Sequence, residues 1–327
     1  MHILVTGAAG MIGRKLVARL IGDGQLNGKP IDALTLVDVV APAKPEAFTG
    51  KVTCKAADLA ADGISQAALA QHPDVIFHLA AIVSGEAELD FDKGYRVNLD
   101  GTRALLEAIR SAGNGCRPKF IFTSSIAVFG APFPPSIPDE FHLTPLTSYG
   151  TQKAMDELLL ADYTRRGFCD GVGIRLPTIC VRPGKPNKAA SGFFSAIIRE
   201  PLAGQEALLP VPETVRHTHA SPRAAVGFLI HAAGLAREQL GPRLNLTMPG
   251  VSCTVGEQIG SLKRIAGDGA VARIRREPDA LVARIVAGWP ERLDASRARA
   301  LGFQAERTFD EIIRSHIADE LGGTIAA

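Results

Sequence analysis

Short runs rich in Val, Ile and Leu alternate with longer stretches of helical periodicity from the start of the chain to about residue 180. Strands of a parallel sheet that are buried on both faces read as continuous apolar runs, and each needs a crossover to reach its neighbour. The alternation therefore predicts an α/β fold, a Rossmann-type doubly wound parallel sheet with right-handed crossovers. The expected strands are His2–Thr6, Ala33–Val37, Lys51–Ala56, Val75–Leu79, Lys119–Thr123 and Gly171–Leu176. The expected helices are Ile12–Ile21, Ile64–Gln71, Tyr95–Ser111 and Gln152–Tyr163.

The alternation of apolar runs and helical stretches ends after Arg175. Three prolines and one glycine fall within residues 176–188, so the chain is expected to leave the first sheet there. A chain of 327 residues is long enough for two unequal lobes. We expect a first domain over residues 1–182, with part of 221–250 returning to it, and a smaller α+β lobe over 183–327 that mainly binds the substrate. A lid-like loop over 131–145 and two amphipathic helices over 294–301 and 309–321 are also expected.

Three glycines follow the first expected strand with the spacing Gly-x-x-Gly-x-x-Gly. Glycine lets such a turn close and lets its backbone approach a pyrophosphate, whose charge then meets the N-terminus of the next helix. A glycine triplet alone could equally serve tight packing of a helix on a strand. Its place between a strand and a helix favours a dinucleotide site, which makes residues 1–182 the cofactor-binding domain. The residues concerned are Gly7, Gly10, Met11, Ile12 and Gly13.

Asp38 directly follows the second expected strand. An acidic residue at this point is placed to bind the ribose hydroxyls of the adenosine. Its charge repels the 2′-phosphate of NADP, so the expected cofactor is NAD. The plainer alternative is a carboxylate that only caps its own loop.

Tyr149 and Lys153 lie four residues apart on one expected helix, so their side chains project from the same face. A tyrosine phenol has an ordinary pKa of about 10, and acting as a base near neutrality requires about 4 kcal/mol of preferential phenolate stabilisation. A neighbouring ammonium and a positively charged nicotinamide ring can supply it together. Such a pair is common on helices by chance, so its position in the chain decides its meaning.

Ser125, upstream of Tyr149 and Lys153, indicates that the pair belongs to a ligand site. The expected strand 119–123 leads into Ser124-Ser125, and side chains at the carboxyl end of a parallel strand lie on the ligand edge of the sheet. Two serines at a strand end are more often turn residues. The ordered set of glycines, Asp38, Ser125, Tyr149 and Lys153 nevertheless favours an enzyme. In it, Ser125 hydrogen-bonds the substrate oxygen that exchanges its proton with Tyr149.

This ordered set resembles the extended short-chain dehydrogenase/reductase family, often described as NAD-dependent epimerases/dehydratases, over nearly the whole chain. The resemblance implies that Tyr149 is the acid/base, that Lys153 also bonds the nicotinamide ribose, and that Ser125 positions the substrate. Asn98 matches the asparagine that supports the active-site helix. Further cofactor contacts are implied for Asp58, Leu59, Leu79, Ala80, Ala81, Asn98, Tyr149, Lys153, Pro177 and Thr178.

Departures from the family pattern reduce the range of candidate reactions and substrates. Ile126-Ala127 stands where sugar-nucleotide dehydratases carry Asp-Glu, so dehydration lacks its acid and base. Arg216 matches the family's anion-binding arginine, but the acidic pair that usually follows is absent. A single arginine suits a small carboxylate held by a bidentate fork. The substrate contacts are expected from Ser84, Ser125, Tyr149, Asn187, Ser191 and Arg216.

The segments 175–187 and 190–195 resemble a branch of the family that oxidises D-erythronate, a four-carbon sugar acid. That resemblance implies that Tyr149 takes the C2 hydroxyl proton while the C2 hydride passes to NAD, giving the 2-oxo acid. The runner-up is a sugar-nucleotide epimerase of the UDP-sugar 4-epimerase type with tightly bound NAD. A third interpretation, from another class, is a nucleotide sensor or scaffold that keeps the fold without the activity.

His217 and His219 invite a metal interpretation, but two histidines without a third nearby ligand make a poor site. The preferred interpretation is a strand with one residue lining a pocket. No metal is expected, because hydride transfer needs none.

The charge balance excludes several kinds of partner. Lys plus Arg number 36 against 34 for Asp plus Glu, which leaves no broad field to attract nucleic acid or a membrane surface. The sequence shows no export signal and no apolar stretch of membrane-spanning length.

Five scattered cysteines without a Cys-x-x-Cys pair fit a reducing compartment. We therefore expect a cytoplasmic enzyme with a small-molecule sugar-acid substrate. A homodimer through helices 95–111 and 152–163 is compatible with their broad apolar faces.

Overall fold

The computed structural model describes residues 1–113, 115–184 and 191–325 of the chain. They form two compact units, each described by itself below. Unit 1 comprises Met1–Val128, Thr147–Arg175 and Val226–Leu246. Unit 2 comprises Phe129–Leu146, Leu176–Ala225 and Thr247–Ala327.

Unit 1 is built on a seven-stranded sheet with the strand order β12-β8-β7-β6-β1-β4-β5. β1 pairs in parallel with β4 and β6, and the pairs β4–β5 and β6–β7 are parallel as well. The chain proceeds outward from β1 in both directions, which is the doubly wound topology with a switch point beside β1. The predicted α/β fold is confirmed. The strands are β1 (His2–Thr6), β4 (Ala33–Asp38), β5 (Lys51–Ala56), β6 (Val75–His78), β7 (Lys119–Ser125), β8 (Asp170–Leu176) and β12 (Asn245–Thr247).

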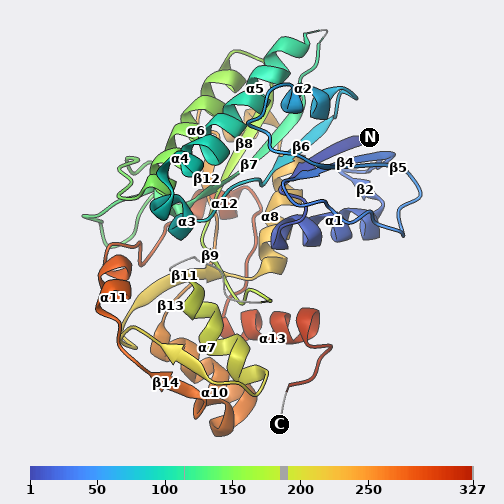
Figure 1. The fold of residues 1–327 in the computed structure, drawn as a ribbon. Coiled ribbons are helices and arrows are strands. Elements are labelled where there is room, and N and C mark those ends of the chain that lie inside the picture. The colour runs from blue at the N-terminus through green and yellow to red at the C-terminus, as the bar shows by residue number, and fades with distance from the viewer. Residues whose placement is uncertain (114, 185–190, 326–327) are drawn as a thin grey trace. The chain divides into compact units, whose positions relative to one another are not determined.

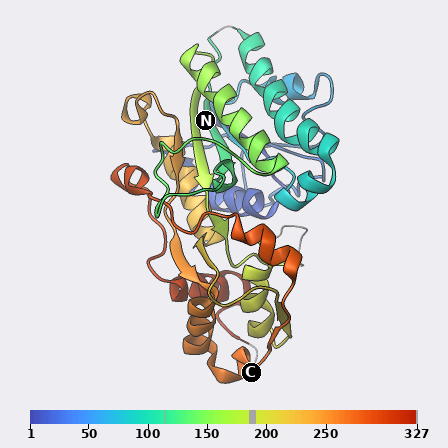
Figure 2. The same cartoon turned by 90° about the vertical axis from the view of Figure 1, so that its left-hand side faces the viewer.

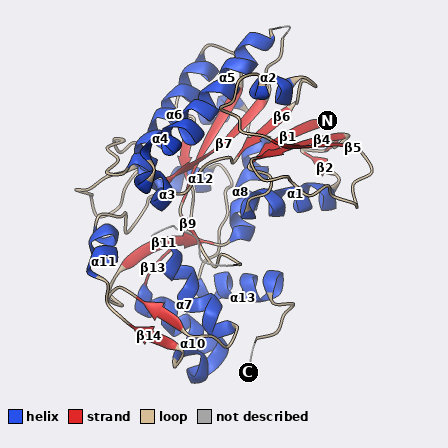
Figure 3. Ribbon diagram, viewed as in Figure 1, coloured by secondary structure: helices blue, strands red, loops and turns tan. Residues whose placement is uncertain are grey.

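Helices cover both faces of this sheet. Figures 1 and 3 show α2, α5 and α6 over one face and α1 and α8 over the other, and α5 and α6 also lie side by side in Figure 2. The helices are α1 (Met11–Asp23), α2 (Ile64–Leu69), α3 (Ser84–Leu89), α4 (Phe91–Gly94), α5 (Gly101–Ala112), α6 (Ser148–Arg165), α8 (Pro222–Gly234, of which unit 1 holds the part from Val226) and α9 (Arg237–Leu240). A small hairpin joins β2 (Gln25–Leu26) to β3 (Lys29–Pro30), a π-helix spans Tyr95–Asp100, and a 3-10 turn spans Ile126–Val128.

The core of unit 1 lies between the sheet and α5 and α6. One apolar cluster joins Leu4, Phe120 and Phe122 on the strands to Leu105 on α5 and Leu160 on α6. Burial of apolar surface contributes about 25 cal/mol per Å², so large side chains of this kind dominate the local stability. The cluster fixes α6 against the sheet, and the first turn of α6 carries Tyr149.

Two of the expected helices differ from the structure in an informative way. The expected helix 95–111 is a π-helix that passes into α5 at Gly101, whose N–H donates to the carbonyl of Arg96. The expected helix 152–163 begins earlier, at Ser148, because the Thr147 hydroxyl accepts a hydrogen bond from Gly150 N at 3.1 Å and caps the helix. Strand ends differ from expectation by only one or two residues.

Unit 2 combines two small sheets with helices. β11 runs antiparallel to β13 and parallel to β9, while β10 and β14 form a separate parallel pair. Its core gathers buried apolar side chains from α7, α10 and α13, including Phe194, Leu262 and Ile312. The elements are β9 (Thr178–Ile179), β10 (Ala207–Leu209), β11 (Arg216–Ala220), β13 (Val251–Thr254), β14 (Ile274–Arg276), α7 (Gly192–Leu202), α10 (Val255–Val271), α11 (Ala280–Ala287), α12 (Ser296–Ala300) and α13 (Phe309–Glu320).

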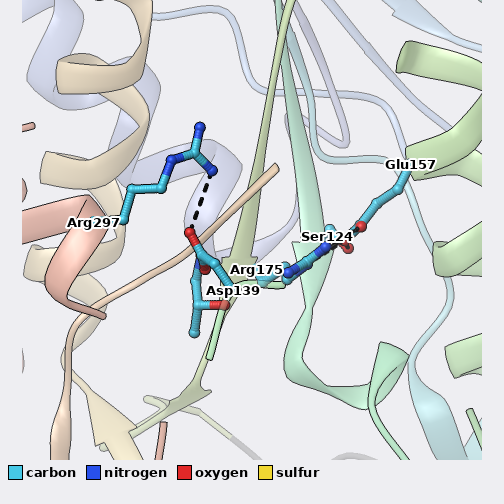
Figure 4. Close-up of polar contacts among 6 residues, drawn as sticks. Ser124, Asp139, Glu157, Arg175 and Arg297 are labelled. Atoms are coloured by element: carbon cyan, nitrogen blue, oxygen red, sulfur yellow. Dashed lines mark hydrogen bonds and ion pairs between the residues drawn. The ribbon is translucent and has the colours of Figure 1, made fainter. Parts of the chain in front are cut away.

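The loop expected as a lid over 131–145 is anchored within unit 2. Ile137 N donates to the carbonyl of Arg292 at 3.1 Å, and Asp294 N donates to the carbonyl of Ile137 at 2.8 Å. The Asp139 carboxylate accepts from Thr247 N at 2.7 Å and pairs with Arg297 at 3.4 Å (Figure 4). These bonds hold the loop along the segment that precedes α12.

None of the helices in the described part of the chain has both the length and the hydropathy that crossing a bilayer requires.

Candidate active site

The glycine-rich turn between β1 and α1 is closely packed at the end of the sheet. Gly7 has φ +72°, and a Cβ there would lie 2.7 Å from the backbone N of Ala80. A Cβ on Gly13 would overlap the carbonyl oxygen of Gly7. Gly10 precedes α1 and gives it no side-chain cap, so the N–H groups of the first turn point out of the helix. A turn of bare backbone at an uncapped helix N-terminus fits a pyrophosphate, and NAD is the group these residues would hold.

Asp38 lies beside this turn at the end of β4. Its Oδ2 accepts a hydrogen bond from Ala9 N at 2.9 Å, and its Oδ1 accepts from Val40 N at 3.2 Å. The loop-capping alternative is therefore part of its role. The same bonds also fix a carboxylate next to the glycine-rich turn, where the adenosine ribose is expected.

The other expected adenosine-side residues follow β5 and β6. Asp58 accepts from Ala60 N at 2.9 Å and pairs with Arg96 at 2.7 Å, so its carboxylate is already engaged. Leu59 is buried beside it. Leu79 N donates to the carbonyl of Thr6 at 3.1 Å, which places the segment 79–81 against the glycine-rich turn.

Ser125, Tyr149 and Lys153 all belong to unit 1. Ser125 is the last residue of β7, and its hydroxyl accepts from Ala127 N at 3.1 Å. Tyr149 lies in the first turn of α6, and α6 packs against β7 and the 3-10 turn that follows Ser125. The ammonium of Lys153 lies 5.9 Å from the centroid of the Tyr149 ring. The expected Tyr–Lys pair on one helix face is therefore present.

Lys153 is 2 % exposed, and its ammonium lies 4.6 Å from the centroid of the Phe122 ring. Burial lowers the pKa of Lys153 to about 8, against the raising effect of the nearby Asp156 and Glu157 carboxyls. The ammonium is thus a charge held in a poorly solvated place, where its effect on a neighbouring phenol is strongest.

An ion pair behind this lysine anchors α6 to the sheet (Figure 4). Arg175 donates from Nε to Oε1 of Glu157 at 2.9 Å and from Nη2 to Oε2 at 2.8 Å. The Ser124 hydroxyl donates to the same Oε1 at 2.6 Å. Glu157 is 0 % exposed, so Arg175 and Ser124 supply the hydrogen bonds that water cannot reach to make. None of these three residues was expected in the site, although Ser124 and Arg175 lie in segments that the sequence singles out.

Asn98 ties a loop to the active-site helix. Its Oδ1 accepts from Ile82 N at 2.8 Å, and its Nδ2 donates to Oε1 of Gln152 at 2.7 Å. Gln152 immediately precedes Lys153 on α6, so these contacts fit the supporting role implied for Asn98. The π-helix at residues 95–100 carries Asn98. Ser84, an expected substrate contact, is the first residue of α3.

The remaining expected contacts lie in unit 2 or beyond the described residues. Thr178, after Pro177, shares a hydrogen bond with Nε2 of His217 at 2.7 Å. Ser191 precedes α7, and its hydroxyl accepts from Arg182 at 3.4 Å. Asn187 lies outside the described residues.

Arg216 lines a polar cavity of about 590 Å³ in unit 2. Its guanidinium donates to the carbonyl of Ser252 at 3.0 Å and pairs with Glu257 at 3.2 Å. Sequence reasoning missed Glu257, which lies on α10 and is far from Arg216 in the chain. The cavity lining also includes Ser136, Thr218, Ser252, Arg292 and Arg299. Three guanidinium groups around one cavity suit an anion.

The two histidines of β11 point away from that cavity. Because side chains alternate along a strand, Arg216 and Thr218 face the cavity, while His217 and His219 pack on Phe194 in the core. Two residues therefore line the pocket where one was expected. Burial holds the pKa of both histidines below its ordinary value. Within the described residues, no group of three or more His, Cys, Asp or Glu side chains could hold a metal ion.

Comparison with known proteins adds independent findings. The family model described as "NAD dependent epimerase/dehydratase family" matches residues 3–220. A relative from Cupriavidus necator named D-erythronate dehydrogenase is 48 % identical over 98 % of this chain and 98 % of its own length. One of the same name from Haemophilus influenzae is 42 % identical over 97 % of this chain and 99 % of its own. A solved structure from Agrobacterium tumefaciens, described as a nucleoside-diphosphate-sugar epimerase, is 65 % identical, with a TM-score of 0.98 over 100 % of this chain and 96 % of that one.

Proposed function

Because this chain belongs to the NAD dependent epimerase/dehydratase family, we propose that it oxidises the C2 hydroxyl of D-erythronate with NAD, giving the 2-oxo acid and NADH. The observation that carries the proposal is the match of nearly the whole chain to two relatives named D-erythronate dehydrogenase. The pairing of Tyr149 with a buried Lys153 supports it chemically.

The mechanism assigns one task to each residue. NAD, when bound, supplies the hydride acceptor. The Tyr149 phenolate takes the proton of the C2 hydroxyl, and the hydroxyl of Ser125 holds the same substrate oxygen in place. The Lys153 ammonium stabilises the phenolate and so makes Tyr149 a competent base. In sum, the C2–H and O–H bonds break, a C=O bond forms, and one proton is released to solvent.

The test is direct. Purified protein incubated with NAD and D-erythronate should produce the absorbance of NADH, and no such signal should appear with a UDP-sugar. A protein that converts a UDP-sugar to its epimer and gives no NADH with any sugar acid would instead be an epimerase. This second candidate belongs in the comparison because the Agrobacterium tumefaciens protein is described as an epimerase.

Arg216 is proposed to hold the substrate carboxylate. Arg216→Lys keeps a positive charge beside Glu257 but loses the planar fork, so we expect KM for D-erythronate to rise about 10-fold with kcat little changed. Steady-state kinetics measure this. The matched control is Arg223→Lys, which alters an exposed arginine paired with Asp319 in the same unit and should leave KM as in the wild type. Equal KM values for the two variants would remove Arg216 from the substrate site.

Asp38 is proposed to select NAD over NADP. Asp38→Asn keeps one oxygen, which can accept from Ala9 N, gives up the acceptor for Val40 N and removes the charge, so the preference for NAD in kcat/KM should fall about 10-fold. Asp23→Asn, at the exposed end of α1, serves as the control. An unchanged ratio of NAD to NADP efficiency would mean that Asp38 only caps its loop.

The proposal includes a cytoplasmic homodimer. All five cysteines are unpaired, which supports a reducing compartment, and Leu158 on α6 is 66 % exposed, which supports a partner surface there. Sedimentation velocity should give the mass of a dimer for the wild type. A monomer at micromolar concentration would contradict this part.

A further inference from the structure

A buried polar chain runs through unit 1 behind Lys153, and the proposed mechanism gives it no task. Thr6 on β1 bonds Nδ1 of His78 at 2.7 Å, and Nε2 of His78 bonds the hydroxyl of Thr102 on α5 at 3.0 Å. The same hydroxyl lies 3.4 Å from Oδ2 of Asp156, one turn beyond Lys153 on α6. All five side chains are at most 2 % exposed. A carboxyl with so little access to water needs an account of its charge.

The hydrogen bonds around Thr102 assign a proton to Asp156. A hydroxyl has one proton to donate and two lone pairs to accept with. The carbonyl of Asn98, 2.6 Å away, can only accept, so it takes the Thr102 proton. His78 then donates through Nε2–H, and because the Thr102 proton is engaged by the shorter contact, the 3.4 Å contact with Asp156 favours a carboxylic acid as its donor. The Thr6 hydroxyl completes the set by donating to Nδ1, with His78 neutral throughout.

Burial points to the same protonation states. Desolvation lowers the pKa of His78 to about 3, which keeps its ring neutral. Desolvation also raises the pKa of Asp156 well above its ordinary value, while the charge of Lys153 acts in the opposite direction. Within the described residues, Oδ1 of Asp156 accepts no hydrogen bond, so an ionised carboxylate would lack a partner for that oxygen.

Lys153 lies near two carboxyls, Asp156 and Glu157, and the other charged groups around them show which of the two is paired elsewhere. Glu157 on α6 is engaged by Arg175 from β8 and by Ser124 from β7. His78 on β6 is neutral, and α5 contributes the Thr102 hydroxyl. As the pH rises, one proton must leave the pair of Lys153 and Asp156 first.

We propose that Asp156 is a positioning residue that gives up its proton to solvent before Lys153 does, so that the carboxylate formed keeps the Lys153 ammonium charged at alkaline pH. Ordinary carboxyl and amine pKa values differ by about 6, a gap that burial must overcome to reverse the order. The rings of Phe122 and Tyr149 favour the charged form of Lys153 further. The inference rests on the proposed function, because the charge on Lys153 matters only if Tyr149 acts as a base.

Asp156→Asn tests the inference through the pH profile. Asparagine keeps the size and a donor for Thr102, but it has no proton to release. Lys153 should therefore lose its charge earlier, and the alkaline limb of kcat/KM for D-erythronate should move down by about one pH unit. The matched control is Asp162→Asn, an exposed aspartate on the same helix, which should keep the wild-type limb. An unmoved limb, or an equal loss at every pH, would overturn the role of Asp156.

A second readout needs no turnover. Infrared difference spectra of wild-type protein labelled with carbon-13 at the aspartate side-chain carboxyl should show a protonated-carboxyl band at neutral pH that disappears at alkaline pH. Asp156→Asn should lack it. A wild type without such a band at neutral pH would contradict the inference even if the variant fails to fold. Because the spectra require no substrate, failure of the proposed function would leave this result standing.

Discussion

Tyr149→Phe should lower kcat/KM for D-erythronate by about 10³- to 10⁴-fold while NAD still binds. The substitution removes one hydroxyl from the first turn of α6 and leaves the ring that packs near Lys153. Without the phenol, no group in the proposed mechanism takes the C2 hydroxyl proton, and the loss is that of an acid/base catalyst. Steady-state rates of NADH formation measure the first effect, and titration of NAD with calorimetric detection measures the second.

A matched control lies on the same helix. Tyr163 on α6 donates its hydroxyl to Glu107, away from the proposed chemistry. Tyr163→Phe should retain wild-type kinetics. If Tyr149→Phe retained the wild-type rate as well, the chain would keep the family fold without the proposed catalytic site, as a nucleotide sensor or scaffold would.

Glu157→Ala should lower the free energy of unfolding by about 3–5 kcal/mol, the usual cost of stripping one partner from a buried ion pair. Arg175 is 5 % exposed and would keep its charge without a carboxylate to meet it. The Ser124 hydroxyl would lose its acceptor too. Urea unfolding curves give the difference.

The comparison variant for this prediction is Asp162→Ala. It removes an acidic partner of Arg165 from the same helix, but both side chains are more than half exposed, so the cost should stay within about 1 kcal/mol. A similar cost for the two variants would mean that burial of the Glu157 pair does not matter to stability.

Much of unit 1 could be predicted because its signals are local. β1 is five consecutive buried residues flanked by a glycine-rich turn, and apolar runs of this kind need only a few positions to be recognised. The pairing of Tyr149 with Lys153 follows from helical spacing alone. Gly7 and Gly13 were identifiable because the strand before them and the helix after them are both visible in the sequence.

The features that could not be predicted depend on residues far apart in the chain. The π-helix at 95–100 carries Asn98, whose partner Gln152 lies 54 positions later in the chain. The proposed protonation of Asp156 depends on Thr102, which contacts it from α5, and on His78, which contacts Thr102 from β6. No local pattern indicates the ion pair of Arg216 with Glu257. The same holds for the backbone hydrogen bonds that join Ile137 to the segment before α12.

In the proposed reaction, the Tyr149 phenol on α6 removes the C2 hydroxyl proton while the C2 hydride leaves for NAD. The most direct measurement uses D-erythronate deuterated at C2 and mass spectrometry of the NADH formed. The NADH should carry the deuterium and accumulate together with the 2-oxo acid. NADH without deuterium, or a deuterium that returns to a sugar carbon with no net NADH, would contradict it.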